Sequence, residues 1–168
     1  MTDQAVSDTG PLRHLTEIGA HPILALFGRI VVPQLVVREL RAQGFWTCLV
    51  RDLSQLLAVV GGPTLRAALA LARTHHLEAA DAAVLAVAAE YPDHILLTDD
   101  LALRRAAKRR GHRVVGTIGV VGRAYQTGRL SLAEADAMLE RLVDESTLYL
   151  TAGVVEQIRE AMRNSPRP

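Results

Sequence analysis

The chain has 168 residues, 49% of them hydrophobic and 22% charged, so its length and composition are those of one ordinary soluble globular domain. This composition excludes a disordered or collagen-like chain, and no apolar stretch reaches the roughly 18 residues that a membrane-spanning helix needs. The net charge of +1 gives no overall bias towards nucleic acid or membrane, and 4% aromatic residues argue against a base-stacking, RNA-binding sheet.

The N-terminal half alternates short apolar runs with helical patterns. We expect a strand at residues 5–8, a turn, and a helix that starts near Pro11 and ends at Gly19. An apolar patch follows at residues 23–27, and a β-branched run at residues 29–32 predicts a buried parallel strand. Pro33 ends that strand and can open a helix that reaches Gly44. Residues 45–62 are the least clear, because leucines at helical spacing favour a helix whereas residues 56–60 fit a strand equally well.

The C-terminal half is easier to interpret. Ser131 and Glu134 form a capping-box pattern at the start of one helix, and Thr151 could cap the last. Expected strands are residues 94–98 and 113–115, and expected helices are residues 64–74, 78–90, 101–110, 118–126, 131–143 and 151–162.

Strands separated by helices are typical of βα units with right-handed crossovers, so the sequence predicts an α/β fold with a parallel sheet between helical layers. Residues after Ser131 have no strand pattern. We therefore expect a domain over residues 1–130 and a C-terminal helical extension over residues 131–168 that packs on it. The N-terminus lacks the positive charge of a signal peptide, and the single cysteine, Cys48, has no intramolecular disulfide partner. Together they favour the reducing cytoplasm.

Acidic residues fall where the predicted strands end, which is where open parallel sheets bind their ligands. Asp8 ends the first strand, and Asp99 and Asp100 follow the strand near Ile95. Glu39 lies within the helix after Pro33, and Asp81 stands among alanines on a helix face that should be buried. Converging carboxylates repel one another, and all-oxygen sites of this kind suit Mg²⁺ or Mn²⁺. Taken singly, each acid is explained as well by a structural role such as capping a helix.

Four segments, in this order, resemble the motifs of the PIN-domain ribonucleases. They are residues 6–12 (VSDTGPL), 32–40 (VPQLVVREL), 81–88 (DAAVLAVA) and 96–100 (LLTDD). Residues 108–120 (KRRGHRVVGTIGV) are similar to a subgroup described as predicted nucleic-acid-binding proteins. The resemblance covers roughly residues 5–130, and it implies a three-layer α/β/α PIN-like fold with a central parallel sheet.

The resemblance also implies a metal-dependent ribonuclease, often the toxin of a toxin–antitoxin pair of the VapC type. It implies a cognate antitoxin, a homodimer and RNA as the substrate. Its catalytic acids would be Asp8, Glu39, Asp81 and Asp100, with Asp8 and Asp100 as direct ligands of Mg²⁺ or Mn²⁺. Glu39 and Asp81 would hold metal-bound water or a second ion, so the candidate metal residues are Asp8, Asp100, Asp81 and, next to Asp100, Asp99. The subgroup commonly has Gly-Glu where this chain has Ala80-Asp81, so the acid is on a shorter arm.

Two further points concern the pocket that the resemblance implies. Thr98 matches a hydroxyl that commonly lines it, and Thr9 would line it too. The pair Asp99-Asp100 leaves open which acid faces the metal, although the spacing from Thr98 favours Asp100. A covalent nucleophile is not indicated, because Cys48 has no histidine near it in the sequence.

Basic residues follow the acidic pair and could form a track for the RNA backbone. The alternative is a solvated outer face of a helix that covers the sheet, which is what charge runs usually are. The candidates for RNA contact are Arg104, Arg105, Lys108 and Arg109. Two other features remain open: Phe45 and Trp46 could anchor a partner or belong to the core, and His75-His76 fits a loop end better than a shared metal ion.

Competing functions are a non-catalytic PIN-like protein that binds nucleic acid or a partner, and a housekeeping RNA-processing nuclease. The complete acidic set favours an enzyme over a binding protein. A phosphoacceptor receiver domain has a similar architecture but needs a lysine at the end of a late strand. The only lysine, Lys108, falls inside a predicted helix, which excludes that alternative.

Overall fold

The computed structural model describes residues 2–61 and 65–164. Its centre is a five-stranded sheet in the order β3-β2-β1-β4-β5, and every neighbouring pair is parallel. The strands are β1 (Gln4–Ser7), β2 (Arg29–Pro33), β3 (Leu57–Val60), β4 (Ile95–Leu97) and β5 (Val114–Val115). The predicted α/β fold with a central parallel sheet is therefore confirmed.

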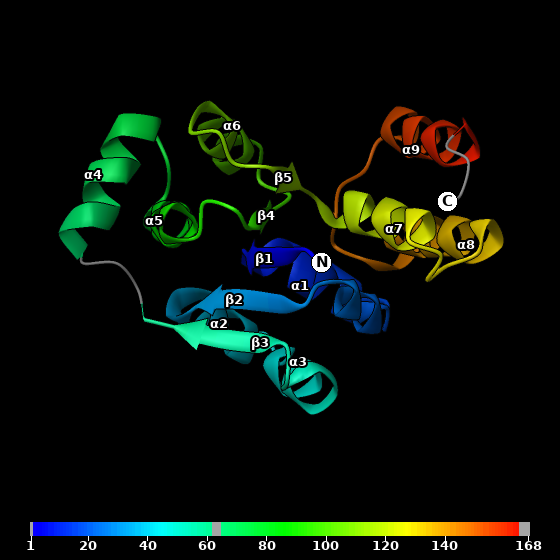
Figure 1. The fold of residues 1–168 in the computed structure, drawn as a ribbon, viewed down its shortest axis with the longest axis horizontal. Helices are drawn as coiled ribbons and strands as arrows, with labels where there is room; N and C mark the ends of the chain where they lie inside the picture. The colour runs from blue at the N-terminus through cyan, green and yellow to red at the C-terminus, as the bar shows by residue number, and fades with distance from the viewer. Residues whose placement is uncertain (1, 62–64, 165–168) are drawn as a thin grey trace.

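Helices cover both faces of this sheet (Figure 1). They are α1 (Thr9–Glu17), the 3₁₀ helix η1 (His21–Leu26), α2 (Gln34–Ala42), α3 (Trp46–Leu53), α4 (Leu65–His75), α5 (Ala79–Glu90), α6 (Leu101–Arg109), α7 (Thr117–Gln126), α8 (Leu132–Glu145) and α9 (Ala152–Asn164). The chain runs outward from β1 to β3 and then returns to β4 and β5. Because parallel crossovers are right-handed, this reversal puts α1–α3 on one face and α4–α6 on the other. The central strands β1, β2 and β4 are almost wholly buried, as expected for parallel strands covered on both faces.

Several element boundaries differ from the sequence-based expectation. Helix α1 starts directly at Thr9 with no intervening turn, because the Asp8 side chain caps it. The apolar patch at residues 23–27 lies largely within η1. Both alternatives for residues 45–62 are realised in turn, since α3 is followed by β3, a fifth strand paired with β2. The predicted start of one helix at Thr64 and the tail at residues 165–168 lie outside the described residues.

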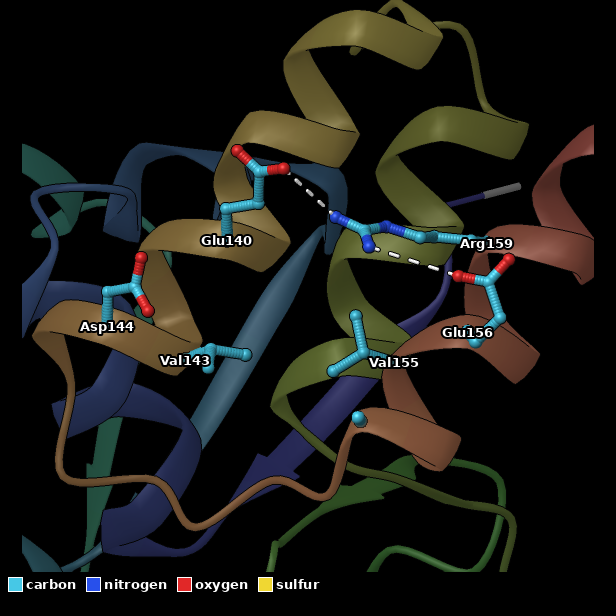
Figure 2. A pocket seen from close by; sticks show the side chains of 7 residues that line it. Glu140, Val143, Asp144, Val155, Glu156 and Arg159 are labelled. Carbon is cyan, nitrogen blue, oxygen red and sulfur yellow. Dashed lines mark hydrogen bonds and ion pairs between the residues drawn. The ribbon is translucent and has the colours of Figure 1, made fainter.

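The C-terminal extension consists of α8 and α9, which pack against each other and against α7. Helix α8 begins with the predicted capping box between Ser131 and Glu134. Figure 2 shows Arg159 of α9 between Glu140 of α8 and Glu156 of its own helix. The Nε atom of Arg159 also donates to Asp136 at 2.5 Å. The division into a domain over residues 1–130 and an extension over residues 131–168 packed on it stays a prediction. None of the helices in the described ranges has the length and apolarity to cross a membrane.

Candidate active site

The candidate site lies where the direction of the sheet reverses. Strand β1 pairs with β2 on one side and with β4 on the other, and the chain leaves β1 towards β2 but reaches β4 from the far edge. Helices after β1 and β4 therefore diverge to opposite faces and leave a crevice at the carboxyl ends of these strands. Asp8 directly follows β1, and residues 98–100 directly follow β4.

A cavity of about 490 Å³ opens at this crevice, and it is strongly acidic. Its lining includes all four of the acids predicted to act together, namely Asp8, Glu39, Asp81 and Asp100. They come from the end of β1, the middle of α2, the first turn of α5 and the start of α6. Glu78 and His76 also line this acidic pocket, although the sequence analysis did not assign either of them to it.

Asp8 is fixed in place by two hydrogen bonds, one to each carboxylate oxygen. Its Oδ1 atom accepts from the backbone N–H of Thr9 at 2.7 Å and caps α1. Its Oδ2 atom accepts from the hydroxyl of Thr98 at 2.8 Å. Capping and pocket lining are therefore roles of the same side chain, so the two interpretations of Asp8 do not compete.

Asp100 and Glu39 are also held by their neighbours. The Oδ1 atom of Asp100 accepts from the backbone N–H of Leu103 at 2.7 Å and caps α6. Its own N–H donates to the hydroxyl of Thr98 at 3.1 Å, so Thr98 connects the two aspartates. The Thr9 hydroxyl donates to Oε2 of Glu39. Thr9 and Thr98 are both buried and lie behind the acids they orient rather than at the cavity surface.

The electrostatics of the acidic pocket are unfavourable for the charges it contains. Burial raises the pKa of Asp8 to about 6, against the hydrogen bonds from Thr98 and Thr9, and the charges of Glu39 and Asp100 add to the rise. Burial likewise raises the pKa of Asp81 to about 7, with repulsion from Asp8 and Asp100 next in importance. Asp81 accepts no side-chain hydrogen bond from any described residue. The pocket thus contains negative charge that the described part of the protein leaves uncompensated.

The donor set suits a hard divalent cation, because every acid that lines the pocket offers carboxylate oxygen and no sulfur. A cation would also stabilise the ionised forms of Asp8 and Asp81, whose pKa values are raised by burial first and by repulsion between the acids second. Within residues 2–61 and 65–164, however, no three His, Cys, Asp or Glu side chains are close enough together to hold a metal ion as they stand. A site with one or two carboxylates and several waters, which is common for Mg²⁺, does not need three such side chains.

Asp99 occupies an environment quite different from that of Asp100. It does not line the acidic pocket, and its side chain is only 16% exposed. Its Oδ2 atom lies 3.0 Å from Nδ1 of His14 and accepts from the Thr117 hydroxyl at 2.5 Å, and its Oδ1 atom accepts from the Thr117 N–H at 2.8 Å. Although burial acts to raise it, the hydrogen bonds from His14 and Thr117 hold the pKa of Asp99 below its ordinary value. Of the two acids left open by the sequence, the structure brings only Asp100 to the pocket.

Glycine makes this arrangement around Asp99 possible. A Cβ atom at Gly116 would lie 2.8 Å from Oδ1 of Asp99 and 2.6 Å from Nη1 of Arg104. At Gly10 a Cβ atom would lie 3.3 Å from Oδ2 of Asp99. Residues 108–120 therefore include a structural element of the fold: Gly116 leaves room for the Asp99 side chain, and Thr117 donates hydrogen bonds to it.

The four basic candidates lie on α6, which starts beside the acidic pocket. Arg105, Lys108 and Arg109 are exposed, whereas Arg104 is half-buried and donates to the carbonyl oxygen of Thr98 at 3.4 Å. Arg109 contacts His75 at 3.4 Å. This placement is compatible with both interpretations of the basic run, so its contact with RNA stays a prediction.

Two of the remaining open features are resolved by packing. Trp46 is buried and Phe45 packs against the core, so both aromatic residues have the core role. His75 contacts Arg109 whereas His76 lines the acidic pocket, so the two adjacent histidines serve different places.

Four residues at or near the site, among them His76, are not assigned to it by the sequence analysis. Glu78 was read only as the start of a helix, although its position three residues before Asp81 puts it one turn away. No sequence signal connects His14 with Asp99, which lies 85 positions away. For Thr117 a signal existed, since the Gly-Thr pair directly after a strand is a pattern for a helix start.

Comparison with known proteins gives one finding. A family model described as a PIN domain matches residues 4–164, which is nearly the whole chain. No curated protein matches the sequence.

Proposed function

The chain belongs to the PIN-domain family, and on that premise we propose that it is a metal-dependent endoribonuclease. PIN domains are generally nucleases and typically use divalent metal ions. The proposed reaction is the hydrolysis of RNA phosphodiester bonds in the acidic pocket, with Mg²⁺ or Mn²⁺ as the cofactor.

The observation that supports this proposal best is the convergence of Asp8, Glu39, Asp81 and Asp100 on one cavity. Residues that served only as helix caps would not need to meet, and Glu39 and Asp81 cap no helix. Burial and the neighbouring acids raise the pKa values of Asp8 and Asp81, so the ionised carboxylates are unfavourable as they stand and a cation in the pocket would stabilise them.

A bound Mg²⁺ or Mn²⁺ would polarise a phosphate oxygen and lower the pKa of a water that attacks phosphorus. The protein contributes orientation: the Thr98 hydroxyl and the N-termini of α1 and α6 fix Asp8 and Asp100 in the direction of the cavity. Thr9 orients Glu39. Asp81, with no hydrogen bond from a described residue, is the carboxylate best able to accept a proton or hydrogen bond from a water in the pocket.

The biological role is proposed on the same basis. We propose that the enzyme is the toxin of a type II toxin–antitoxin pair that acts in the cytoplasm as a homodimer and is inhibited by a cognate antitoxin. A housekeeping RNA-processing nuclease would have the same pocket. An adjacent small gene whose product forms a stable complex with the enzyme and blocks cleavage would favour the toxin.

The test is cleavage of a labelled RNA panel with Mg²⁺, with Mn²⁺ and with EDTA. Asp8→Asn, Asp81→Asn and Asp100→Asn remove one charge each from the pocket. Asp93→Asn is the matched control, because Asp93 is exposed and precedes β4, at the opposite edge of the sheet. We expect cleavage that needs the metal, that is lost in the three pocket variants and that is retained in the control. Metal binding without cleavage of any RNA would favour the non-catalytic alternative. If no metal binds, the shared role of the four acids is wrong.

A further inference from the structure

A second cavity lies at the same edge of the sheet, on the other side of the start of α6. Its volume is about 360 Å³, and its lining includes Leu101 and Arg104 of α6, Ile118 of α7, Tyr149, and Val154 of α9. Asp100 lines the acidic pocket and Leu101 lines this second groove, so adjacent residues face the two cavities. Residues that follow the carboxyl ends of β2, β1 and β4 line the acidic pocket, and residues that follow β4 and β5 line the groove. Together they form one continuous edge, where open parallel sheets bind ligands.

Tyr149 is presented to solvent by a segment that is itself held in place. The segment between α8 and α9 passes the start of α7 near β5 (Figure 1). Thr147 donates from its N–H and its hydroxyl to the carboxylate of Glu17, each at 2.8 Å. Leu148 and Leu150 are partly buried on either side, and Tyr149 between them is 89% exposed. Because the neighbouring residues anchor the backbone here, stacking on Tyr149 costs less ordering entropy than stacking on an aromatic residue of a free loop.

The groove that Tyr149 lines is also lined by Arg104, whose guanidinium has no carboxylate partner among the described residues. Arg104 donates only to a carbonyl oxygen, at 3.4 Å, and forms no ion pair with a carboxylate of a described residue. Arg105 is exposed on the next position of α6. Asp99 borders the groove, but both of its oxygens are engaged by His14 and Thr117. An exposed aromatic ring beside an unpaired guanidinium is the surface on which single-stranded nucleic acids bind, with bases on the ring and phosphates at the cation.

We propose that this groove is a subsite for the substrate strand, in which one nucleobase stacks on Tyr149 and a neighbouring phosphate contacts Arg104. The inference rests on the proposed ribonuclease function, because the RNA bound in the groove would extend into the acidic pocket. Stacking tolerates any base, so the subsite contributes affinity and position with little choice of sequence. A partner protein docked on the same groove is the alternative that the experiments below distinguish.

Binding of a short fluorescent single-stranded RNA to the full chain in EDTA, followed by anisotropy, measures this contact without cleavage. We expect Tyr149→Ala to weaken binding about tenfold and Tyr149→Phe to bind like the wild type, because phenylalanine keeps the ring. Leu132→Ala is the matched control, since Leu132 is an exposed apolar residue at the start of α8 and does not line the groove. An RNA of the same length made of abasic nucleotides should bind the wild type and Tyr149→Ala equally, because the ring then has no base to stack on.

Photocrosslinking gives an independent readout of position. RNA that contains 5-iodouridine should crosslink to Tyr149, which lies in the tryptic peptide of residues 142–159, bounded by Arg141 and Arg159. Equal affinity of Tyr149→Ala and wild type, with crosslinks only to other peptides, would overturn the subsite while cleavage by the wild type left the proposed function intact. A change in molar mass on light scattering with unchanged RNA affinity would make the groove a protein interface and overturn the subsite too. A wild type that neither binds nor cuts any RNA would remove both proposals.

Discussion

Asp99 and Asp100 are neighbours in the sequence, yet the structure puts them in opposite chemical environments. Asp99 is satisfied by His14 and by two donors of Thr117, and its pKa is lowered. Asp100 faces the acidic pocket together with Asp8 and Asp81, and the pKa values of those two acids are raised. Asp99 therefore connects the end of β4 to α7 through hydrogen bonds, whereas Asp100 adds a negative charge to the acidic pocket.

The difference teaches how a structural carboxylate and a functional one can be told apart. A buried carboxylate whose hydrogen bonds outweigh the cost of its burial, as at Asp99, has a lowered pKa and needs no ligand. Asp8 also has a donor on each oxygen, but burial and the neighbouring acids outweigh them and its pKa is raised. Carboxylates that repel one another in a shared cavity make the protein less stable and are stabilised by a cation. The Asp99 network and the acidic pocket should thus respond to mutation in opposite ways: stability depends on the first, and activity depends on the second.

The largest effect is expected on activity at the acidic pocket. Asp100→Asn should lower the rate of RNA cleavage at least about a hundredfold, because it removes one charge from the proposed metal site. Stability should change little, since asparagine caps α6 nearly as well as aspartate. Single-turnover cleavage in Mg²⁺ and unfolding by urea measure the two quantities on the same samples. Cleavage within a few-fold of wild type would contradict the assignment of Asp100.

The next effect is on stability at Asp99. Asp99→Ala should lower the free energy of unfolding by about 2–3 kcal/mol, because Thr117 and His14 lose the acceptor that both of them share. Urea unfolding at neutral pH measures this loss. Thr117→Val removes only the hydroxyl and leaves the backbone N–H, so its cost should be smaller, about 1 kcal/mol. A variant Asp99→Ala as stable as the wild type would mean that the network contributes nothing to the fold.

A smaller effect concerns the pH dependence of stability. The pKa values of Asp8 and Asp81, about 6 and about 7, are above the ordinary value of 3.8. In the pH range between the ordinary value and these raised values, the folded state therefore binds more protons than the unfolded state. The free energy of unfolding should therefore fall as pH rises from about 4 to about 7 and then level off. Asp99, with its lowered pKa, has the opposite sign and stabilises the fold above the ordinary pKa of aspartate.

Asp81→Asn isolates this contribution. The variant should be about 1 kcal/mol more stable than the wild type at pH 8 and equal to it at pH 4, after allowance for the screening of a half-buried carboxylate. Urea titrations at the two pH values give the difference. Addition of Mg²⁺ at pH 8 should raise the melting temperature of the wild type more than that of Asp81→Asn. An equal rise in both melting temperatures would show that Asp81 does not contribute to binding the metal.

The smallest effect is expected on the basic face of α6. Reversing charge at Arg105 and Arg109, both exposed, should weaken RNA binding several-fold and flatten its dependence on salt by about one unit of slope. Anisotropy titrations at several salt concentrations give both numbers. Arg29→Glu provides a control, because Arg29 is exposed at the amino end of β2, away from the pocket. If the salt dependence of RNA affinity is unchanged in the Arg105 and Arg109 variants, these residues do not contact RNA and this side of α6 is only a solvated surface.

Much of the fold could be predicted from the sequence, because local patterns reflect local physics. The β-branched runs, the glycine stops and the capping box at Ser131 each report the backbone conformation of a few neighbouring residues. Strand β3 was left open because an edge strand is half-exposed and lacks the continuous apolar run of a buried one. The start of α1 was misplaced because Thr9 and Gly10 are common in turns, and only the Asp8 cap decides otherwise.

The sequence by itself determined which acids were candidates and that a parallel sheet would carry their backbones to one edge. Only the tertiary structure decided where each carboxylate points. Asp99 and Asp100 have the same chemistry and adjacent positions, but successive residues at the end of a strand project in different directions. Which of them meets His14 and Thr117, and which faces Asp8, depends on partners 18 to 92 positions away in the chain. That choice is made where α1 packs against α7 beside the end of β4, and no local pattern contains it.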